Sequence, residues 1–347
     1  MSDKLNENLF NLLQADPGHL YFIAEAGLNH GGSKERALAM VRAAKWAGAD
    51  AVKFQTFKAD RLTAKTKSEL THKKGVDLQE MFRQLELSHD EFRVIHKEAT
   101  RLDIEFLSTP FDEDSADFLD ELGVGAFKVA SGDITHRPLV KHLGSKGKPI
   151  LLSTGMSTSE EIEKAIDWIF SEQNTEIILL HCISAYPPKP EELNIKSVEF
   201  LRDRFGLPVG FSDHSVDSMG AIVAVSLGAQ VVERHFMLDT RGNVPDRAVS
   251  FDTKQLRSHI QELRAVGTIL GERGKVASES ESANLTASRR SLYARRPIES
   301  GETISSDMLY ALRPAVGISP EFVDDVVGRS ASSSIGVDEP VNWDSIG

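Results

Sequence analysis

The sequence of 347 residues contains a single cysteine, Cys182, and lacks any long run of apolar residues. A lone cysteine excludes an internal disulfide and is typical of a reducing compartment. No segment approaches the roughly 20 consecutive apolar residues of a membrane span, and the N-terminus has no basic region followed by an apolar one. We therefore expect a soluble cytoplasmic protein.

Positive charge is also in short supply. The chain has 40 Lys and Arg against 52 Asp and Glu, a net charge of −12, which argues against a nucleic-acid or anionic-membrane partner. An anionic substrate is not excluded, because a few lysines and helix N-termini can reverse the field inside a cleft. The junction at Ser153-Thr154-Gly155 lacks the glycine spacing of a Rossmann or P-loop motif, so nucleotide binding is not indicated.

Short apolar runs alternate with amphipathic stretches along most of the chain. The amphipathic stretches carry apolar residues at helical spacing, and eight apolar runs read as strands, at residues 20–24, 51–54, 104–107, 126–129, 149–152, 177–180, 209–211 and 230–232. Eight strand–helix units predict a (β/α)8 TIM barrel, because a doubly wound sheet usually has fewer strands. The polar segment 56–87 predicts an insertion that overhangs the active-site face and acts as a lid.

The chain is longer than the roughly 250–300 residues at which a single core stops growing, which predicts a second, smaller domain. A last barrel helix at 253–270 precedes a polar, serine-rich run. We therefore expect a barrel over residues 1–271, a linker over 272–288 and a small β-rich domain over 289–347. A domain of that size is marginal alone and is expected to dock on something.

Two histidines occupy matching positions. Ser212-Asp213-His214 and Glu233-Arg234-His235 each close an apolar segment, and they are about one strand–helix–strand step apart. Because a barrel presents its chemistry at the carboxyl ends of its strands, His214 and His235 are expected side by side as ligands of a divalent metal. The alternative is two unrelated histidines at loop edges.

Two lysines, Lys53 and Lys128, lie within apolar runs. A lysine buried among core residues needs an anionic partner, since burying it alone costs several kcal/mol. Together with hydroxyls at other strand ends, the pair predicts a site for a phosphate and a carboxylate. The alternative is two charges that reach out of the barrel rim to solvent. Polar residues at or near the strand ends are Glu25, Gln55, Thr109, Ser131, Asp133, Ser153, Ser184, Tyr186 and Ser212.

From about residue 20 to the end, the sequence resembles the sialic acid synthase family, whose members condense phosphoenolpyruvate with an N-acetylated hexose to make nonulosonic acids. The motifs that carry the resemblance are Ala24-Glu25-Ala26-Gly27-Leu28-Asn29-His30, Val52-Lys53-Phe54-Gln55, Ser108-Thr109-Pro110-Phe111, Phe127-Lys128-Val129-Ala130-Ser131-Gly132-Asp133, Leu152-Ser153-Thr154-Gly155-Met156, Gly210-Phe211-Ser212-Asp213-His214 and Glu233-Arg234-His235-Phe236. The final segment, with Arg289-Arg290-Ser291-Leu292 and Leu312-Arg313-Pro314, resembles the antifreeze-like (SAF, β-clip) domain of these enzymes.

The resemblance implies a role for each matching residue. His214 and His235 would bind a divalent cation, typically Mn²⁺, with Mg²⁺ or Co²⁺ as alternatives. Arg313 would enter the barrel of a second subunit, which implies a domain-swapped homodimer. Glu25 would orient the sugar or transfer a proton. The residues implied to hold phosphoenolpyruvate are Lys53, Thr109, Lys128, Ser131, Ser153 and Ser212, and those implied to line the sugar pocket are Glu25, Gln55, Asp133, Tyr186 and Asp246.

Three departures from the family pattern bear on the acceptor sugar. Ser184 stands where an asparagine that helps to bind phosphoenolpyruvate is usual, Asp133 replaces a glutamate and is shorter by a methylene, and the loop over residues 240–251 differs. They leave N-acetylmannosamine and the 2,4-diacetamido-trideoxyhexoses open, and favour a bacterial-type sugar slightly. Two other functions stay open: a 3-deoxy-octulosonate or heptulosonate phosphate synthase, and a non-catalytic protein that binds sugar or ice.

Overall fold

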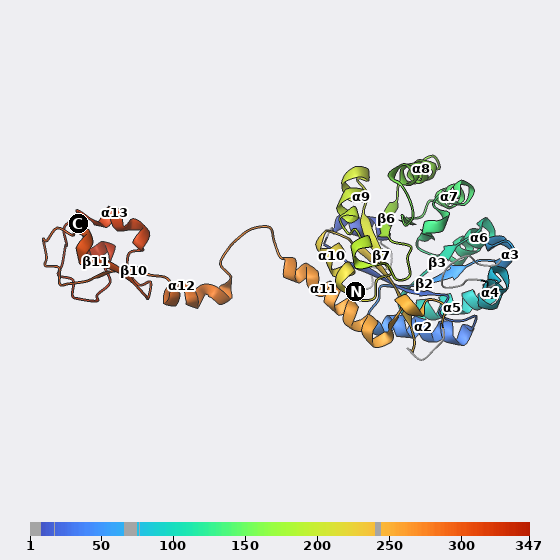
Figure 1. Ribbon diagram of the computed structural model, residues 1–347, viewed down its shortest axis with the longest axis horizontal. Helices are drawn as coiled ribbons and strands as arrows, with labels where there is room; N and C mark the ends of the chain where they lie inside the picture. The colour runs from blue at the N-terminus through green and yellow to red at the C-terminus, as the bar shows by residue number, and fades with distance from the viewer. Residues whose placement is uncertain (1–7, 17, 66–74, 76, 240–243) are drawn as a thin grey trace. The chain divides into compact units, whose positions relative to one another are not determined.

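The computed structural model describes residues 8–16, 18–65, 75, 77–239 and 244–347 (Figure 1). The chain divides into two compact units, Met1–Gly271 and Glu272–Gly347. The first unit is an α/β barrel and the second a small β-containing domain. None of the helices in these described ranges is long and apolar enough to cross a membrane.

Among the described residues, eight parallel strands form the barrel in the order β3-β2-β1-β8-β7-β6-β5-β4, and β4 lies against β3 to close it. This confirms the predicted (β/α)8 architecture. A short strand β9, Phe251–Asp252, pairs with β8. The barrel strands are β1 Tyr21–Gly27, β2 Ala51–Thr56, β3 Glu105–Pro110, β4 Phe127–Val129, β5 Ile150–Ser153, β6 Ile177–Cys182, β7 Val209–Asp213 and β8 Val231–Met237.

Most strands extend further toward their carboxyl ends than the apolar runs predicted. Glu25 pairs with Lys53 in the β1–β2 ladder and with His235 in the β1–β8 ladder, so these polar residues belong to the strands themselves. The apolar pattern stops early because the last residues of each strand carry the polar groups of the carboxyl face while the backbone remains extended.

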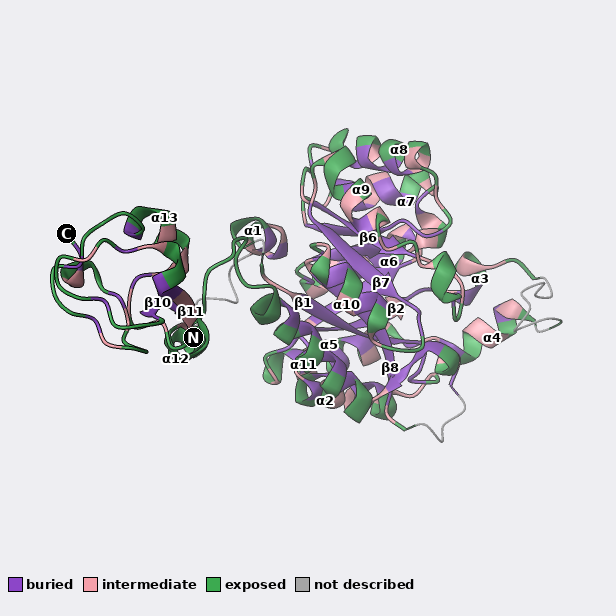
Figure 2. Cartoon of the chain, turned by 60° about the vertical axis from the view of Figure 1, so that its left-hand side comes forward, coloured by how far each residue is buried: buried purple, intermediate pink, exposed green. Residues whose placement is uncertain are grey.

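Helices surround the barrel, with exposed outer faces and buried faces against the strands (Figure 2). Several begin at side-chain caps: Ser88 and Glu91 form a capping box at α5, and Thr158 and Glu161 form one at α8. The helices of this unit are α1 Leu9–Ala15, α2 Lys34–Ala47, α3 Ala59–Leu62, α4 Leu78–Leu85, α5 His89–Arg101, α6 Glu113–Leu122, α7 Arg137–Gly144, α8 Ser159–Phe170, α9 Ser197–Phe205, α10 Met219–Ser226 and α11 Thr253–Leu270.

Two apolar clusters hold the barrel together. The larger lies between the strands and the surrounding helices. The smaller fills the barrel interior, where Leu9 and Leu13 of α1 pack against Ile23, Leu151 and Ile178. The first helix therefore closes the amino end of the barrel, and the carboxyl end carries the polar residues.

The predicted insertion over residues 56–87 contains α3 and α4, while residues 66–74 and 76 lie outside the described residues. Its described part packs on the barrel through an aromatic cluster in which Phe57 contacts Phe82 and Phe111 edge-on, at ring-centroid distances of 5.5 and 6.1 Å. The insertion thus adjoins the carboxyl face, and its action as a lid stays a prediction.

The second unit contains α12 Ser282–Ser288, β10 Ser291–Ala294, β11 Leu309–Leu312 and α13 Val323–Val326. Strands β10 and β11 pair antiparallel, and further β-bridges join Ile298 to Ile335 and Thr303 to Ser330. The unit has its own apolar core, built on residues such as Leu292, Ile304 and Val341. Helix α12 falls within the stretch 272–288 that the sequence assigned to a polar linker.

Gly210 of β7 is a point where the barrel tolerates no side chain. A Cβ there would lie 2.4 Å from the Val231 carbonyl oxygen and 2.7 Å from Leu180 Cδ2. We predict that Gly210→Ala lowers the free energy of unfolding by about 2 kcal/mol or more, as overpacking against backbone does. In urea denaturation, Gly267→Ala is the matched control, because a Cβ on this α11 residue meets nothing within 4 Å and should stabilise by about 0.5–1 kcal/mol. Equal midpoints for the two variants would contradict the prediction.

Candidate active site

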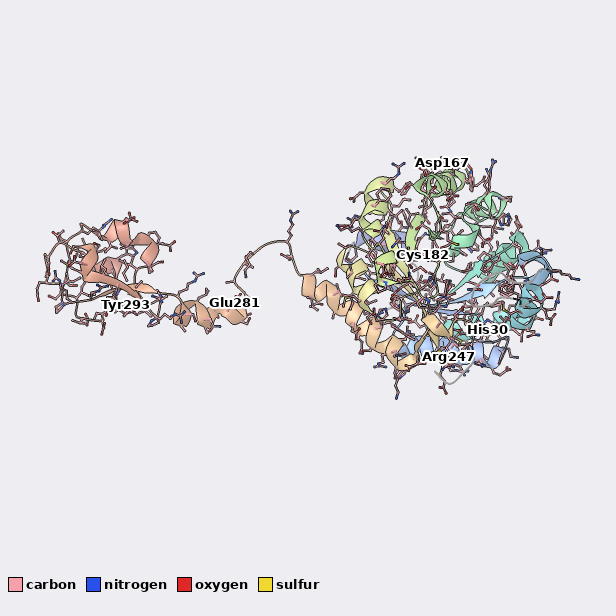
Figure 3. All side chains as sticks on the ribbon, in the orientation of Figure 1. His30, Asp167, Cys182, Arg247, Glu281 and Tyr293 are labelled. Atoms are coloured by element: carbon pink, nitrogen blue, oxygen red, sulfur yellow. The ribbon has the colours of Figure 1, made fainter. Side chains whose placement is uncertain are left out.

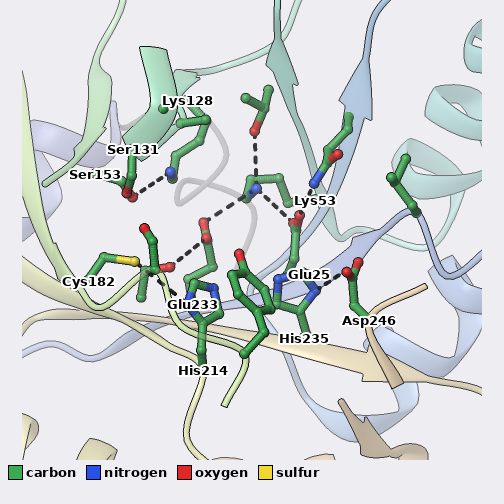
Figure 4. Close-up of a pocket in the computed structure, with 18 of the residues that line it drawn as sticks. Glu25, Lys53, Lys128, Ser131, Ser153, Cys182, His214, Glu233, His235 and Asp246 are labelled. Atoms are coloured by element: carbon green, nitrogen blue, oxygen red, sulfur yellow. Dashed lines mark hydrogen bonds and ion pairs between the residues drawn. The ribbon is translucent and has the colours of Figure 1, made fainter. Parts of the chain in front are cut away.

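The carboxyl ends of the barrel strands enclose a pocket of about 360 Å³ (Figure 4). Most of the predicted site residues of the barrel line this pocket, namely Glu25, Lys53, Gln55, Thr109, Lys128, Ser131, Ser153, Ser184, Tyr186, Ser212, His214, His235 and Asp246. The structure therefore brings together residues that span more than 200 positions of the sequence.

Asp133 is not among the residues that line this pocket, and its contact with a sugar stays a prediction. Asp133 ends the one-turn helix Ser131–Asp133 and is half-buried, and the first two residues of that turn, Ser131 and Gly132, line the pocket. Burial raises the pKa of the Asp133 carboxyl.

Four charged side chains, those of Glu25, Lys53, Lys128 and Glu233, meet at the bottom of the pocket. Lys53 Nζ lies 2.8 Å from Glu25 Oε2 and 3.6 Å from Glu233 Oε2, and these three side chains are 6% exposed or less. Lys53 also donates a hydrogen bond to Thr109 Oγ1 at 3.2 Å. Two carboxylates of the protein therefore supply the anionic partner that a buried lysine was expected to need, and a contact of Lys53 with phosphoenolpyruvate stays a prediction.

Glu233 was missed by the sequence reasoning, although a signal was present. Side chains alternate across a strand, so the residue two before the inward-facing His235 must face inward as well. Ser212, across the β7–β8 ladder, donates a hydrogen bond to Glu233 Oε1 at 3.0 Å.

The two carboxylates differ in their protonation. Burial raises the pKa of Glu25, and the charge of Glu233 adds to that rise, while Lys53 opposes it. Burial alone would also raise the pKa of Glu233, but Lys128 and Lys53 outweigh it and hold the pKa below its ordinary value. Glu233 is therefore the fixed negative charge of the cluster, and Glu25 is the carboxylate that can hold a proton.

Lys128 has a different environment from Lys53. Its Nζ donates to Ser153 Oγ at 2.6 Å and to the Val129 carbonyl at 3.0 Å. No carboxylate among the described residues makes an ion pair with it. Burial lowers its pKa, which is the sign of an ammonium that lacks full compensation. An anion in the pocket would supply that compensation.

Hydroxyl groups gather beside Lys128. Ser131 Oγ accepts a hydrogen bond from the Gly155 amide at 3.0 Å. A Cβ on Gly155 would lie 2.4 Å from Ser184 Oγ and 2.8 Å from Ser131 Oγ, so a glycine is needed here for the two hydroxyls to approach the strand end. Lys128, Ser131, Ser153 and Ser184 together form a cradle for a phosphate or carboxylate.

His214 and His235 lie side by side, with ring centroids 5.4 Å apart, and the Tyr186 ring stacks on His214 at 4.1 Å. His214 Nδ1 lies 2.9 Å from the Ile183 carbonyl. Because a carbonyl can only accept, this nitrogen carries a proton, and Nε2 is the atom that offers a lone pair when the ring is neutral. Burial would lower the pKa of His214, but Cys182, the Ile183 carbonyl and Glu233 outweigh it and hold the pKa above its ordinary value. His235 Nδ1 is buried without a hydrogen-bond partner, 3.6 Å from Asp246 Oδ2. Burial lowers the pKa of His235, and the nearby positive charges lower it further.

This pair suits a divalent cation, because two adjacent imidazoles are common metal ligands and a bound cation would displace the proton from His214 Nε2. In the described part of the chain, no cluster of three or more His, Cys, Asp or Glu side chains is arranged to hold a metal. A cation bound here would therefore rely on water or substrate for its remaining ligands.

Apolar walls complete the pocket, and the sequence reasoning did not identify them. Leu28, Phe82, Phe111 and Met156 line it, and Phe82 comes from the insertion rather than from a strand end. Cys182, visible in the barrel in Figure 3, is buried as expected but also lines the pocket, with its Sγ 3.8 Å from His214 Nδ1.

Arg313 belongs to the second unit, where it directly follows β11 and is exposed. The hydroxyl of Tyr293, labelled in Figure 3, donates to the Pro314 carbonyl at 2.8 Å. This bond fixes the chain beside Arg313 within its own domain.

A barrel with buried lysines, hydroxyls and paired histidines at its carboxyl face has the layout of an enzyme that acts on an anionic substrate. The NeuB family model matches residues 40–275 and the SAF domain model matches residues 289–347. The chain belongs to the NeuB family.

Relatives cover nearly the whole chain. N,N'-diacetyllegionaminic acid synthase of Legionella pneumophila is 39% identical over 94% of each chain, and a pseudaminic acid synthase of Campylobacter jejuni is 34% identical over 91% of this chain and 93% of that one. The structure of an N-acetylneuraminic acid synthetase from Leptospira borgpetersenii, in complex with citrate, superposes with a TM-score of 0.70 at 30% identity, covering 78% of this chain and 91% of that one.

The buried charge cluster predicts strong coupling between Lys53 and Glu25. Lys53→Met leaves two buried carboxylates without their shared cation and should lower the free energy of unfolding by about 3 kcal/mol or more. The double variant Lys53→Met/Glu25→Gln should regain about 1–3 kcal/mol of that loss in urea titrations, because one of the two uncompensated carboxylates is gone. The exposed pair Arg93–Asp90, 2.7 Å apart, is the control cycle and should show a coupling near 0.5 kcal/mol or less. Additive effects at Lys53 and Glu25 would disprove the coupling.

Proposed function

We propose that this protein is a nonulosonic acid synthase, which condenses phosphoenolpyruvate with an N-acetylated hexose and releases phosphate by C–O cleavage. The observation that carries the proposal is the pocket in which Lys128, without a carboxylate partner, faces a serine cradle beside two histidines. Membership of the NeuB family, with relatives named as legionaminic and pseudaminic acid synthases, supports the same reaction. The free, buried Cys182 supports a cytoplasmic location.

The substrates divide between the two sides of the pocket. Lys128 with Ser131, Ser153 and Ser184 would hold the phosphate and carboxylate of phosphoenolpyruvate, with Lys53, Thr109 and Ser212 at the deeper end. The acceptor sugar would then lie toward Gln55, Tyr186 and Asp246. This placement keeps the two reacting carbons close, which contributes much of the catalytic effect in a two-substrate reaction.

The reaction forms one carbon–carbon bond. C3 of phosphoenolpyruvate attacks the aldehyde carbon of the open-chain sugar, and the positive charge that develops at C2 is met by a water molecule. The resulting tetrahedral intermediate expels phosphate with its bridging oxygen. Lys128 and Lys53 stabilise the departing anion, and Glu25, whose pKa burial raises, would hold or transfer a proton near the sugar.

We further propose that His214 and His235 bind a divalent cation, Mn²⁺ with Mg²⁺ or Co²⁺ as alternatives. The adjacent rings of His214 and His235 support this, and Nδ1 of His235 has no hydrogen-bond partner among the described residues. When bound, the cation would act as a Lewis acid toward the sugar aldehyde.

Two other functions are less well supported. A heptulosonate or octulosonate phosphate synthase would need cationic side chains for the terminal phosphate of its acceptor, and the basic residues that line this pocket are the two lysines and the two histidines. A non-catalytic sugar- or ice-binding role leaves the four buried charges without a purpose.

An assay of phosphate release from phosphoenolpyruvate tests the proposal. We expect release with an N-acetylated hexose, fastest with a 2,4-diacetamido-trideoxyhexose, and a loss of more than about 100-fold after chelation that added Mn²⁺ reverses. His235→Ala should stay inactive with added Mn²⁺, whereas the surface control His142→Ala should behave as wild type. Turnover of arabinose 5-phosphate or erythrose 4-phosphate alone would favour the rival synthases, and full activity of His235→Ala would refute the metal site.

We also propose a domain-swapped homodimer in which Arg313 of one subunit enters the other subunit's barrel. Arg313→Ala and His235→Ala homodimers should each be nearly inactive. Mixed and re-equilibrated, they should recover about a quarter of wild-type activity, because about half of the dimers are mixed and each has one intact site. Mixing Arg313→Ala with wild type is the control. No recovery in a mixture shown by mass spectrometry to contain heterodimers would disprove the swap.

A further inference from the structure

His214 and His235 are held by the sheet in different ways. His235 lies inside β8 and pairs with Glu25 of β1. The β7–β8 ladder ends at the pair Asp213–Arg234, and β7 itself ends at Asp213. His214 therefore lies just past the last paired residue of its strand. Its distance from His235 depends on interactions other than the strand ladder.

A buried ion pair supplies these interactions. Arg234 Nη1 lies 2.5 Å from Asp213 Oδ2, and it also donates to Ser215 Oγ at 3.2 Å and to the Asp217 carbonyl at 3.3 Å. The other oxygen of Asp213 accepts a hydrogen bond from the Ser215 amide at 2.8 Å. The Arg234 guanidinium therefore binds the chain on both sides of His214, at Asp213 before it and at Ser215 and Asp217 after it.

Burial of the Asp213–Arg234 ion pair carries a large desolvation cost. Both side chains are 0% exposed, and within the described chain Arg234 Nε and Nη2 have no hydrogen-bond partner. The guanidinium carbon lies 3.8 Å from the centre of the Phe251 ring, which compensates in part. Because a buried ion pair often stabilises a fold no better than apolar residues would, its retention here points to a positional role.

We propose that Asp213 and Arg234 are positioning residues that set the separation of the His214 and His235 rings, and thereby the affinity of the site for a divalent cation. The inference rests on one part of the proposed function, the binding of a divalent cation by His214 and His235. Asp213 and Arg234 alternate with the pocket-lining residues of their strands and are absent from the pocket wall. They act on the site through the backbone and touch no substrate.

Metal affinity separates positioning from stability. In calorimetric titrations of the metal-free protein with Mn²⁺, Arg234→Lys and Asp213→Asn should each raise the dissociation constant by about 10- to 100-fold, the range for residues that orient metal ligands. Tyr21→Phe is the matched control. It removes a part-buried hydrogen bond of 2.6 Å to Glu105 at the opposite end of the barrel. It should bind Mn²⁺ as wild type does despite a lower stability.

A readout without metal makes the test independent of the cation. In ¹⁵N NMR of the metal-free protein, the His214 Nδ1 signal reports the hydrogen bond to Ile183, and it should shift or broaden in Arg234→Lys but not in Tyr21→Phe. If Arg234→Lys does not fold, Asp213→Asn/Arg234→Gln removes both buried charges and takes its place.

The outcomes are distinct. Wild-type Mn²⁺ affinity and an unchanged His214 signal in the Arg234 and Asp213 variants would overturn the inference and leave the metal site intact. If the wild type binds no Mn²⁺, the metal part of the proposed function fails, and the His214 signal decides alone. An altered signal would then support positioning of the ring, and an unchanged one would overturn it.

Discussion

The barrel's carboxyl face depends on mutual neutralisation of charge. The strand ends converge there, so Glu25, Lys53, Lys128 and Glu233 are all buried within the same pocket wall. Any of these charges alone would cost several kcal/mol to bury. The arrangement commits Lys53 to both carboxylates and leaves Lys128 with hydroxyl and carbonyl partners. Three of the four buried charges thus neutralise one another, and the Lys128 ammonium is left able to bind an external anion.

The β1–β2 and β1–β8 ladders place Glu25 between Lys53 and His235. The charge cluster and the histidine pair are therefore adjacent parts of one wall, connected by a single residue. Glu25 contacts Lys53 on one side and lies next to His235 on the other. A change in the protonation of Glu25 therefore alters the charge beside both residues. The buried charges and the two imidazoles therefore lie next to one another in a single pocket.

Much of this could be read from the sequence. The eight apolar runs predicted every barrel strand, and 253–270 predicted helix α11 to the residue. What the apolar pattern could not give is where a strand stops, since β8 continues through Glu233, Arg234 and His235 as a ladder of polar residues. The backbone pairing there is set by neighbouring strands rather than by side-chain hydrophobicity, which a single sequence does not display.

The site residues that the sequence reasoning missed or left uncertain differ in whether they lie on a strand. Glu233 is deducible, since strand alternation alone places it beside His235. Asp133 lies in a one-turn helix, where no simple period fixes the direction of a side chain, and it is absent from the lining of the pocket. Phe82 reaches the pocket through its contact with Phe57 inside the insertion, and Phe57 in turn contacts Phe111, which follows β3. Local periodicity thus predicts residues on strands and fails where the chain leaves them.

Residues on strands and residues on loops also contribute differently to the pocket. Lys53, Lys128, Glu233 and His235 lie on strands whose ladders fix them, and changing one disturbs the charge balance of the whole face. The acceptor side is built differently. Asn29 binds the Phe236 carbonyl, Ser250 and the amide of Asp246, and so ties the segment that carries Asp246 to the barrel, while Phe82 and Phe111 depend on the insertion. These side chains can vary without uncovering a buried charge. Substitutions in the loops can therefore reshape this side of the pocket with little effect on the charges carried by the strands, whereas a change among those charges also affects the stability of the fold.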